Sequence, residues 1–107
     1  DDGLNFAWLT HGASGVISVA AHADAHSWRQ MIAAVDAGDL ASARTLARRL
    51  RPLVHAIMGG GQGAVMAKEA LHLQGRLPCP ALRLPLVRAE EAEVAALREV
   101  LAASGLL

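Results

Sequence analysis

The sequence predicts a mostly α-helical chain that contains one short β-strand. Alanine and leucine, both strong helix formers, dominate its 107 residues, and 53% of the residues are hydrophobic. Along most of the chain the apolar residues recur at spacings of three and four, as they do in helices that bury one face. One run of β-branched residues interrupts this pattern. The length suits a single small domain.

The first third of the chain is expected to hold a short helix, the strand and a longer helix. The short helix covers Leu4–His11, with Asp2 as its cap and Gly12 at its end. The strand covers Gly15–Val19, and we expect it to be buried like a parallel strand, because it is apolar on both faces. The longer helix covers Asp24–Ala37. A parallel strand needs neighbours, and the sequence contains no other run of this kind.

The middle of the chain predicts one long helix. Gly38 ends the preceding helix, and Asp39 is a good N-cap for the next one. Apolar residues then repeat at helical spacing over Leu40–Ile57. Pro52 lies inside this helix and should kink it, because proline has no amide hydrogen and its ring clashes with the preceding turn. The cluster Gly59–Gly63 is expected to break the helix.

The last third predicts two helices joined by an extended connector. The first helix covers Ala64–Leu73 and is stopped by Gly75. The connector, Arg76–Val87, contains three prolines and should lie on the surface with its leucines tucked in. The second helix covers Ala89–Ala103, starts with acidic residues that complement the helix dipole, and is closed by Gly105.

The composition excludes several classes of protein. Ten Lys and Arg residues balance ten Asp and Glu residues, and zero net charge argues against a general nucleic-acid binder. No apolar run approaches the roughly 18–20 residues of a membrane span. The chain opens on Asp1 and Asp2, unlike a basic signal peptide, and its start resembles the interior of a longer chain. Cys79 is the only cysteine, so no internal disulfide can form, which suits a reducing cytoplasm. The chain has no tyrosine, which excludes a tyrosine proton relay within it.

One pair of histidines is a candidate metal site. His22 and His26 stand four residues apart with Asp24 between them, and histidines at this spacing on a helix can both bind Zn²⁺. However, no third ligand is identifiable nearby, and the segment lies at a junction between strand and helix. We therefore expect polar residues at a helix start and no metal site.

The other candidate features also have ordinary structural interpretations. The cluster Gly59–Gly63 lacks the Lys and Ser or Thr that a phosphate-binding loop needs after its last glycine, so we interpret it as a helix break. Cys79 lies between two prolines with no histidine beside it, which argues against a nucleophile. Lys68 is the only lysine and lies within a helix, as surface lysines do. Four arginines lie close together in the sequence: Arg44, Arg48, Arg49 and Arg51. We interpret them first as a solvated helix face and second as a binding site for a phosphate or an acidic partner.

Several segments, taken in this order and spacing, resemble the C-terminal part of the dihydrodipicolinate synthase family. The most specific are Gly15–Val19, which reads Gly-Val-Ile-Ser-Val, and the connector motif Leu82–Pro85, which reads Leu-Arg-Leu-Pro. The segment Leu71–Gly75 looks most like actinobacterial members. The remaining matches are the acidic start, Gly12–Gly15, Ala37–Leu40, Arg51–Leu53, Lys68 and Gly105–Leu107.

The resemblance implies the C-terminal part of a (β/α)8 TIM barrel, an α/β fold, with a helical extension. Residues 1–38 would form the end of the barrel, with its last helix, strand and helix, and residues 39–107 would form the extension. It also implies a lyase that condenses pyruvate with aspartate semialdehyde, through a Schiff base, to 4-hydroxy-tetrahydrodipicolinate in lysine and diaminopimelate biosynthesis. Such an enzyme would be a cytoplasmic homo-oligomer, a dimer or tetramer, with no cofactor beyond the covalent Schiff base and no metal.

Few functional positions of the family fall within this chain. Ile17 matches the isoleucine that lines the pyruvate pocket. Asp1 and Asp2 match the positions after a substrate-contacting glycine, and in related sialic-acid lyases the equivalent acidic pair contacts substrate hydroxyls. Lys68 matches a lysine of an extension helix and not the Schiff-base lysine, and the family's proton-relaying tyrosine would lie upstream. We therefore expect no catalytic residue in this chain and no activity from the chain alone.

Two alternatives remain open. Other pyruvate aldolases, such as sialic-acid or 2-keto-3-deoxy-sugar lyases, share the implied architecture, and most residues that decide the substrate would lie upstream. Alternatively, the chain is a noncatalytic helical module that associates with itself or a partner, because an unpaired strand and exposed apolar faces favour association. One feature departs from the family pattern, since Gly59–Gly63 replaces the more usual Asn- and Pro-containing break.

Overall fold

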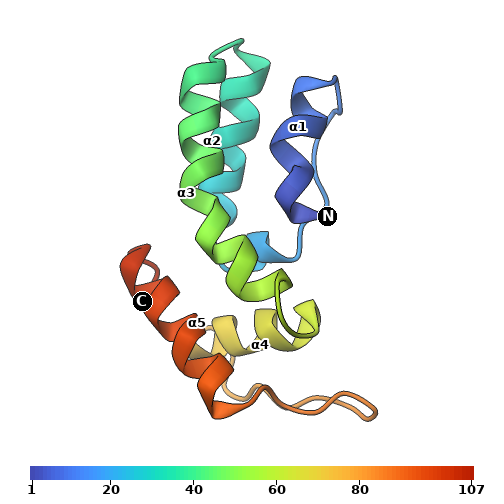
Figure 1. The fold of residues 1–107 in the computed structure, drawn as a ribbon, viewed down its shortest axis with the longest axis vertical. Helices are drawn as coiled ribbons and strands as arrows, with labels where there is room; N and C mark the ends of the chain where they lie inside the picture. Colours follow the sequence, from blue (N-terminus) through green and yellow to red (C-terminus); the bar gives the residue numbers. More distant parts are fainter.

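The computed structural model describes all residues from 1 to 107. Its regular elements are all helices, and it has no β-strand. The molecule is elongated, with extents of 42 × 27 × 21 Å. Helices α1, α2 and α3 lie along the long axis, and α4 and α5 pack across the lower end of α3 (Figure 1). The elements in order are η1 (Asp2–Leu4), α1 (Asn5–Thr10), η2 (Ala20–His22), α2 (Ala25–Asp36), α3 (Leu40–Met58), α4 (Gly63–Leu73) and α5 (Glu91–Ala103).

The prediction of a buried strand over Gly15–Val19 is wrong for this chain. The segment is extended only as far as Ser18, because Val19 has helical backbone angles (φ −75°, ψ −42°), and none of the segment's backbone amides donates a hydrogen bond within the chain. Val16 and Val19 pack partly against the core, whereas the Ile17 side chain is fully exposed at 103% of its reference area. A strand forms only when a second strand supplies hydrogen-bond partners, and no other segment here is extended alongside this one.

The start of the chain also differs in detail from the prediction. The helix expected over Leu4–His11 begins instead as the 3₁₀ turn η1 and continues as the six residues of α1. The cap of η1 is Asp1, whose side chain accepts a hydrogen bond from the amide of Gly3, and not the expected Asp2. Gly12 follows α1 with φ of 99°, a conformation that favours glycine.

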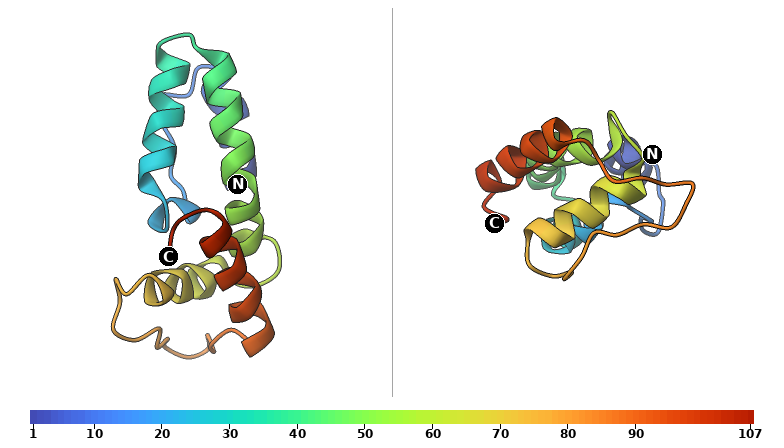
Figure 2. Two further views of the ribbon diagram at one scale, coloured as in Figure 1. Left: turned by 90° about the vertical axis from the view of Figure 1, so that its left-hand side faces the viewer. Right: turned by 90° about the horizontal axis from the view of Figure 1, so that it is seen from below.

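The two predicted helices, α2 and α3, are present and form an antiparallel hairpin (Figure 2). Gly38 turns the chain between them with φ of 75°. Asp24 caps α2 through the amide of Ser27, and Asp39 caps α3 through the amide of Ser42 at 3.0 Å. Hydrogen bonds from Ser42 lower the pKa of the Asp39 carboxyl below its usual value. Both helix starts therefore sit where their sequence-coded caps place them.

Helix α3 is a single helix of 19 residues with Pro52 inside it. Figure 1 shows its lower half leaning away from the axis of its upper half, as expected where a proline removes one backbone hydrogen bond. Gly59 ends the helix, and a virtual Cβ there would lie 2.5 Å from the carbonyl oxygen of His55. The glycine cluster thus breaks the helix as expected, and a side chain at Gly59 would collide with the last turn.

The connector between α4 and α5 has no regular structure and projects from the lower end of the molecule (Figure 1). Its leucines are only partly tucked in, because Leu84 is 87% exposed while Leu82 and Leu86 are half-buried. Helix α5 begins at Glu91, two residues later than predicted, behind a capping box formed by Glu90 and Glu93. In this box the Glu93 carboxylate accepts the amide hydrogen of Glu90 at 2.9 Å.

One cluster of 14 buried residues runs from α1 to α5 and includes residues from both sides of position 38. Its best-buried large side chains come from α2, α3 and α5. Gln74, at the end of α4, ties this cluster to two distant segments, because its Nε2 donates to the carbonyl oxygens of Ala23 at 2.9 Å and Leu106 at 3.2 Å. None of the helices is both long and apolar enough to span a membrane.

Candidate functional site

The extended segment and the acidic start of the chain meet at one buried carboxylate. Asp2 is only 6% exposed, and its Oδ2 accepts the amide hydrogen of Ala20 at 2.8 Å. Its Oδ1 accepts from Nδ2 of Asn5 at 3.3 Å. Because Ala20 directly follows the extended segment, Asp2 fixes the end of that segment against the start of η1. The structure therefore brings two of the sequence-predicted regions together through a contact 18 residues apart.

The three predicted substrate-binding residues have different surroundings. Asp1 is exposed, and only its Oδ1 is engaged, by the amide of Gly3 at 2.9 Å. Both carboxylate oxygens of Asp2 accept hydrogen bonds from within the chain. Ile17 stands out from the surface with no contact that shields it from water.

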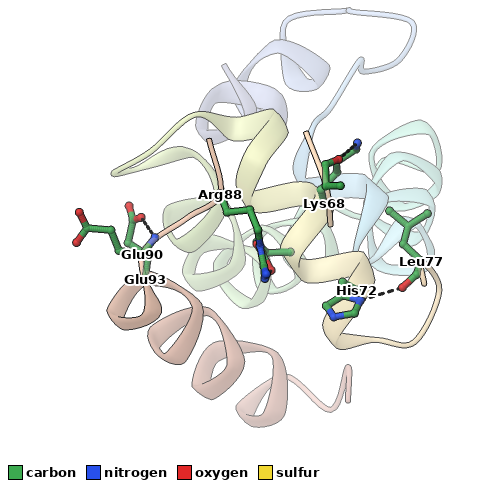
Figure 3. A network of polar contacts seen from close by, with 8 residues as sticks. Lys68, His72, Leu77, Arg88, Glu90 and Glu93 are labelled. Atoms are coloured by element: carbon green, nitrogen blue, oxygen red, sulfur yellow. Dashed lines mark hydrogen bonds and ion pairs between the residues drawn. The ribbon is translucent and has the colours of Figure 1, made fainter. Parts of the chain in front are cut away.

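Lys68 does not face an acidic or acceptor-rich pocket. It lies on α4, and its Nζ donates to the carbonyl oxygen of Ala81 in the connector at 2.6 Å (Figure 3). This hydrogen bond to a backbone carbonyl holds the connector against α4. The geometry is that of a positioning contact for a loop, and no group beside the ammonium is suited to remove its proton.

The same loop is held by an ion pair with a buried carboxylate and an exposed guanidinium, which the sequence analysis did not identify. Glu69, on α4, is 1% exposed, and Arg88 donates to both of its oxygens, at 3.0 and 3.2 Å (Figure 3). The hydrogen bonds and negative charge of Glu69 raise the pKa of the Arg88 guanidinium. A nearby contact joins Nδ1 of His72 to the carbonyl oxygen of Leu77 at 3.0 Å. The burial of Glu69 could have been predicted from its spacing, because it stands four residues after Val65 and shares the buried face of α4 with it.

The histidine pair does not form the helical arrangement that would suit a metal. His22 belongs to η2, where its Nδ1 contacts the carbonyl oxygen of Val19 at 3.0 Å, and His26 belongs to α2. The structure contains no group of three or more His, Cys, Asp or Glu side chains placed to hold a metal ion. Cys79 is a free, exposed thiol on the connector.

A hollow between α1 and α3 gathers most of the predicted arginine face. This cavity, which we call the arginine groove, has a volume of about 380 Å³. Its walls include apolar side chains from three helices, and its edge carries three of the four arginines, whereas Arg49 does not line it. These lining side chains include Phe6, Trp28, Met31, Arg44, Arg48 and Arg51.

Comparison with known proteins places these features in one family. The sequence model of the dihydrodipicolinate synthetase family matches residues 1–104. A 4-hydroxy-tetrahydrodipicolinate synthase of Bifidobacterium longum is 44% identical over 107 residues, covering all of this chain and 36% of that protein. The enzyme of the same name from Kineococcus radiotolerans is 48% identical over 106 residues, covering 99% of this chain and 34% of that protein. Actinobacterial relatives are thus among the matches, as the segment Leu71–Gly75 predicted.

Solved structures agree with the sequence relatives. The dihydrodipicolinate synthase of Thermotoga maritima superposes with a TM-score of 0.95 at 38% identity, covering all of this chain and 36% of that one. The dihydrodipicolinate synthase of Aquifex aeolicus gives a TM-score of 0.92 at 30% identity, covering 99% of this chain and 36% of that one. The chain spans about a third of the length of the relatives that it matches.

Proposed function

Because the chain belongs to the dihydrodipicolinate synthetase family, we propose that it is the C-terminal part of a lyase that condenses pyruvate with aspartate semialdehyde. The product would be 4-hydroxy-tetrahydrodipicolinate, a precursor of lysine and diaminopimelate. The Schiff-base lysine and the proton-relaying tyrosine of such an enzyme lie outside these residues, since the chain has no tyrosine and Lys68 binds the connector. The chain contributes walls to the substrate pocket and a helical extension.

One observation carries this proposal: no backbone amide of the segment Gly15–Val19 donates a hydrogen bond within the chain, and the segment holds an exposed isoleucine. A segment of this kind is suited to insertion between two parallel strands. We propose that it becomes a strand of a (β/α)8 barrel whose other strands come from the rest of the enzyme. Ile17 would then face the pyruvate pocket, and this would account for an isoleucine that has no cover here.

Asp1 and Asp2 fit the same arrangement, and each would have a different role. Active sites of (β/α)8 barrels lie at the carboxyl ends of the strands, where the residues just after a strand gather. We place Asp1 and Asp2 after the strand that precedes Gly15–Val19. Asp1 would be the member of the pair that contacts substrate, because one of its oxygens is free. Asp2 would fix the neighbouring strand through Ala20, because both of its oxygens are already engaged.

The remaining assignments follow from the family. Residues 1–38 would close the barrel, and residues 39–107 would form its helical extension. The whole enzyme would be a cytoplasmic dimer or tetramer that uses only the covalent Schiff base with pyruvate, with neither a metal nor a separate cofactor. Lys68, Glu69 and Arg88 would serve the extension by holding its long connector in place.

A chimera tests the proposed function. These 107 residues would replace the segment that they match in the Bifidobacterium longum enzyme. We expect the chimera to retain synthase activity, and pyruvate with borohydride to label a lysine of the Bifidobacterium longum part. Ile17→Asp should reduce kcat/KM on the order of 100-fold, because a carboxylate in the pocket wall repels pyruvate and is costly to bury. Ile17→Val should leave the activity nearly unchanged.

Three outcomes would contradict the proposal. The first is a folded but inactive chimera, and the second is an Ile17→Asp chimera as active as its Ile17→Val control. The third is a borohydride-trapped pyruvate adduct on Lys68, whether in the chimera or in the chain alone. The chain alone is expected to give no adduct and no activity.

A second candidate function is favoured by three exposed apolar side chains in the first part of the chain. Leu4, Trp8 and Ile17 are 52%, 56% and 103% exposed, and such groups suit a noncatalytic module that associates with itself or a partner. Light scattering distinguishes the lyase part from the association module. If the unpaired segment is a barrel strand without its neighbours, the purified chain should form heterogeneous, concentration-dependent assemblies. A single defined oligomer would favour the association module, and a compact monomer would count against both.

A further inference from the structure

The three arginines of the arginine groove lack acidic partners. The only ion pair in the chain joins Arg88 to Glu69. Asp2 also lines the groove, but it forms no ion pair with any of the three arginines, and its single negative charge faces three positive ones. The groove therefore presents unbalanced positive charge beside apolar walls.

The arrangement of these arginines is regular. Arg44, Arg48 and Arg51 are spaced by four and three residues, so they lie on one face of α3. At 1.5 Å per residue the three positions extend over about 10 Å. Arg49 lies on the same helix, is also exposed, and does not line the groove. The helix thus carries three cations toward the hollow and one away from it.

We propose that the arginine groove binds a small amphipathic anion, with a phosphate or carboxylate group at the arginines and an aromatic or aliphatic body against the apolar walls. The planar guanidinium binds both kinds of anion through paired hydrogen bonds. Phe6, Ala47 and Val54 are half-buried and offer the apolar surface on which the body of the ligand rests, with Trp28 buried behind them. Of the residues given a role in the proposed lyase only Asp2 lines the groove, and the proposal rests on the arginines and the apolar walls, so it does not depend on the lyase function.

The size of the groove favours a small molecule over a helix of a partner protein. Its volume of about 380 Å³ falls within the range of small-molecule sites. A ligand with one ring and one anionic group fills the groove and reaches at least two of the arginines.

Tryptophan fluorescence of the whole chain, at concentrations below those at which light scattering detects assembly, provides the test. The chain has two tryptophans, and Trp8→Phe leaves Trp28, in the groove wall, as the only reporter. Phenyl phosphate is the probe, since it joins a ring to a dianion. We expect a saturable change of Trp28 emission that fits one site. Arg48→Ala in the same background should weaken binding about tenfold, the loss expected for one charge-assisted contact. Arg49→Ala should change it less than twofold.

Further variants and ligands decide the result. Arg48→Lys keeps the charge without the planar fork and should fall between wild type and Arg48→Ala. Benzyl alcohol and inorganic phosphate should each bind much more weakly than phenyl phosphate. The proposal is overturned by an equal loss in Arg48→Ala and Arg49→Ala, by inorganic phosphate binding as well as phenyl phosphate, or by no saturable response. It is also overturned if only an acidic helical peptide, or a second copy of the chain, occupies the groove. Circular dichroism of each variant checks that the fold is kept.

Discussion

Leu97→Ala is expected to lower the free energy of unfolding by about 3 kcal/mol, because it leaves a cavity in the centre of the core. Leu97 lies on the inner face of α5 and has no exposed surface. It belongs to the buried cluster that joins α5 to α3 and α4. A loss of this size is a large fraction of the roughly 5–15 kcal/mol that stabilises a small domain. Urea unfolding followed by helical circular dichroism measures it.

The matched control is Leu84→Ala. This leucine belongs to the connector and is 87% exposed, so the same chemical change removes no packing. Its effect should stay within about 0.5 kcal/mol, as is usual for surface positions. Equal losses in Leu97→Ala and Leu84→Ala would contradict the packing described for α5.

Asp2→Ala should cost about 2 kcal/mol of stability, within the range found for leaving a buried polar group without its partner. The substitution removes the acceptor of the Ala20 amide and frees Nδ2 of Asn5. Both donors lie in buried residues, so water replaces the lost carboxylate poorly. Thermal unfolding gives the change in stability, and amide hydrogen exchange at Ala20 should accelerate with it.

Asp1→Ala provides the comparison for this carboxylate. Asp1 is exposed and caps only the 3₁₀ turn, so its loss should be smaller than that of Asp2 and should leave exchange at Ala20 unchanged. If Asp1→Ala proved the more damaging of the two, the buried contact between Asp2 and Ala20 would not be a main link between η1 and η2.

The helices were predictable because their signals are local. Asp39 and Gly38 fix the hairpin of α2 and α3 by a side-chain cap and a positive φ, and neither depends on distant parts of the chain. Gly75 ends α4 in the same way. The prediction failed at Gly15–Val19, where β-branched residues indicate a strand but a strand needs hydrogen-bond partners from another segment. The local sequence pattern shows the preference for an extended backbone, and pairing with another segment decides whether a strand forms.

The contacts of the candidate site were less predictable than the helices. Asp2 was expected as a cap because it stands before a helix, whereas its buried role depends on Ala20, 18 residues later. Likewise, Glu69 and Arg88 are 19 residues apart, and nothing in their spacing pairs them. The arginine face was predictable from its periodicity, but the hollow beside it arises from the way α1 packs. Residue type and period predict faces of helices, and they do not predict which distant groups meet there.

The amide of Gln74 has a consequence for the order in which the chain folds. It binds Ala23, 51 residues earlier, and Leu106, 32 residues later, so one side chain closes two long loops. Closing a loop of this length costs chain entropy that no local contact offsets, whereas a helical hairpin such as α2 and α3 closes only a short turn. The hairpin should therefore form early in folding. The C-terminal residues dock last, when α4 is already in place to receive them.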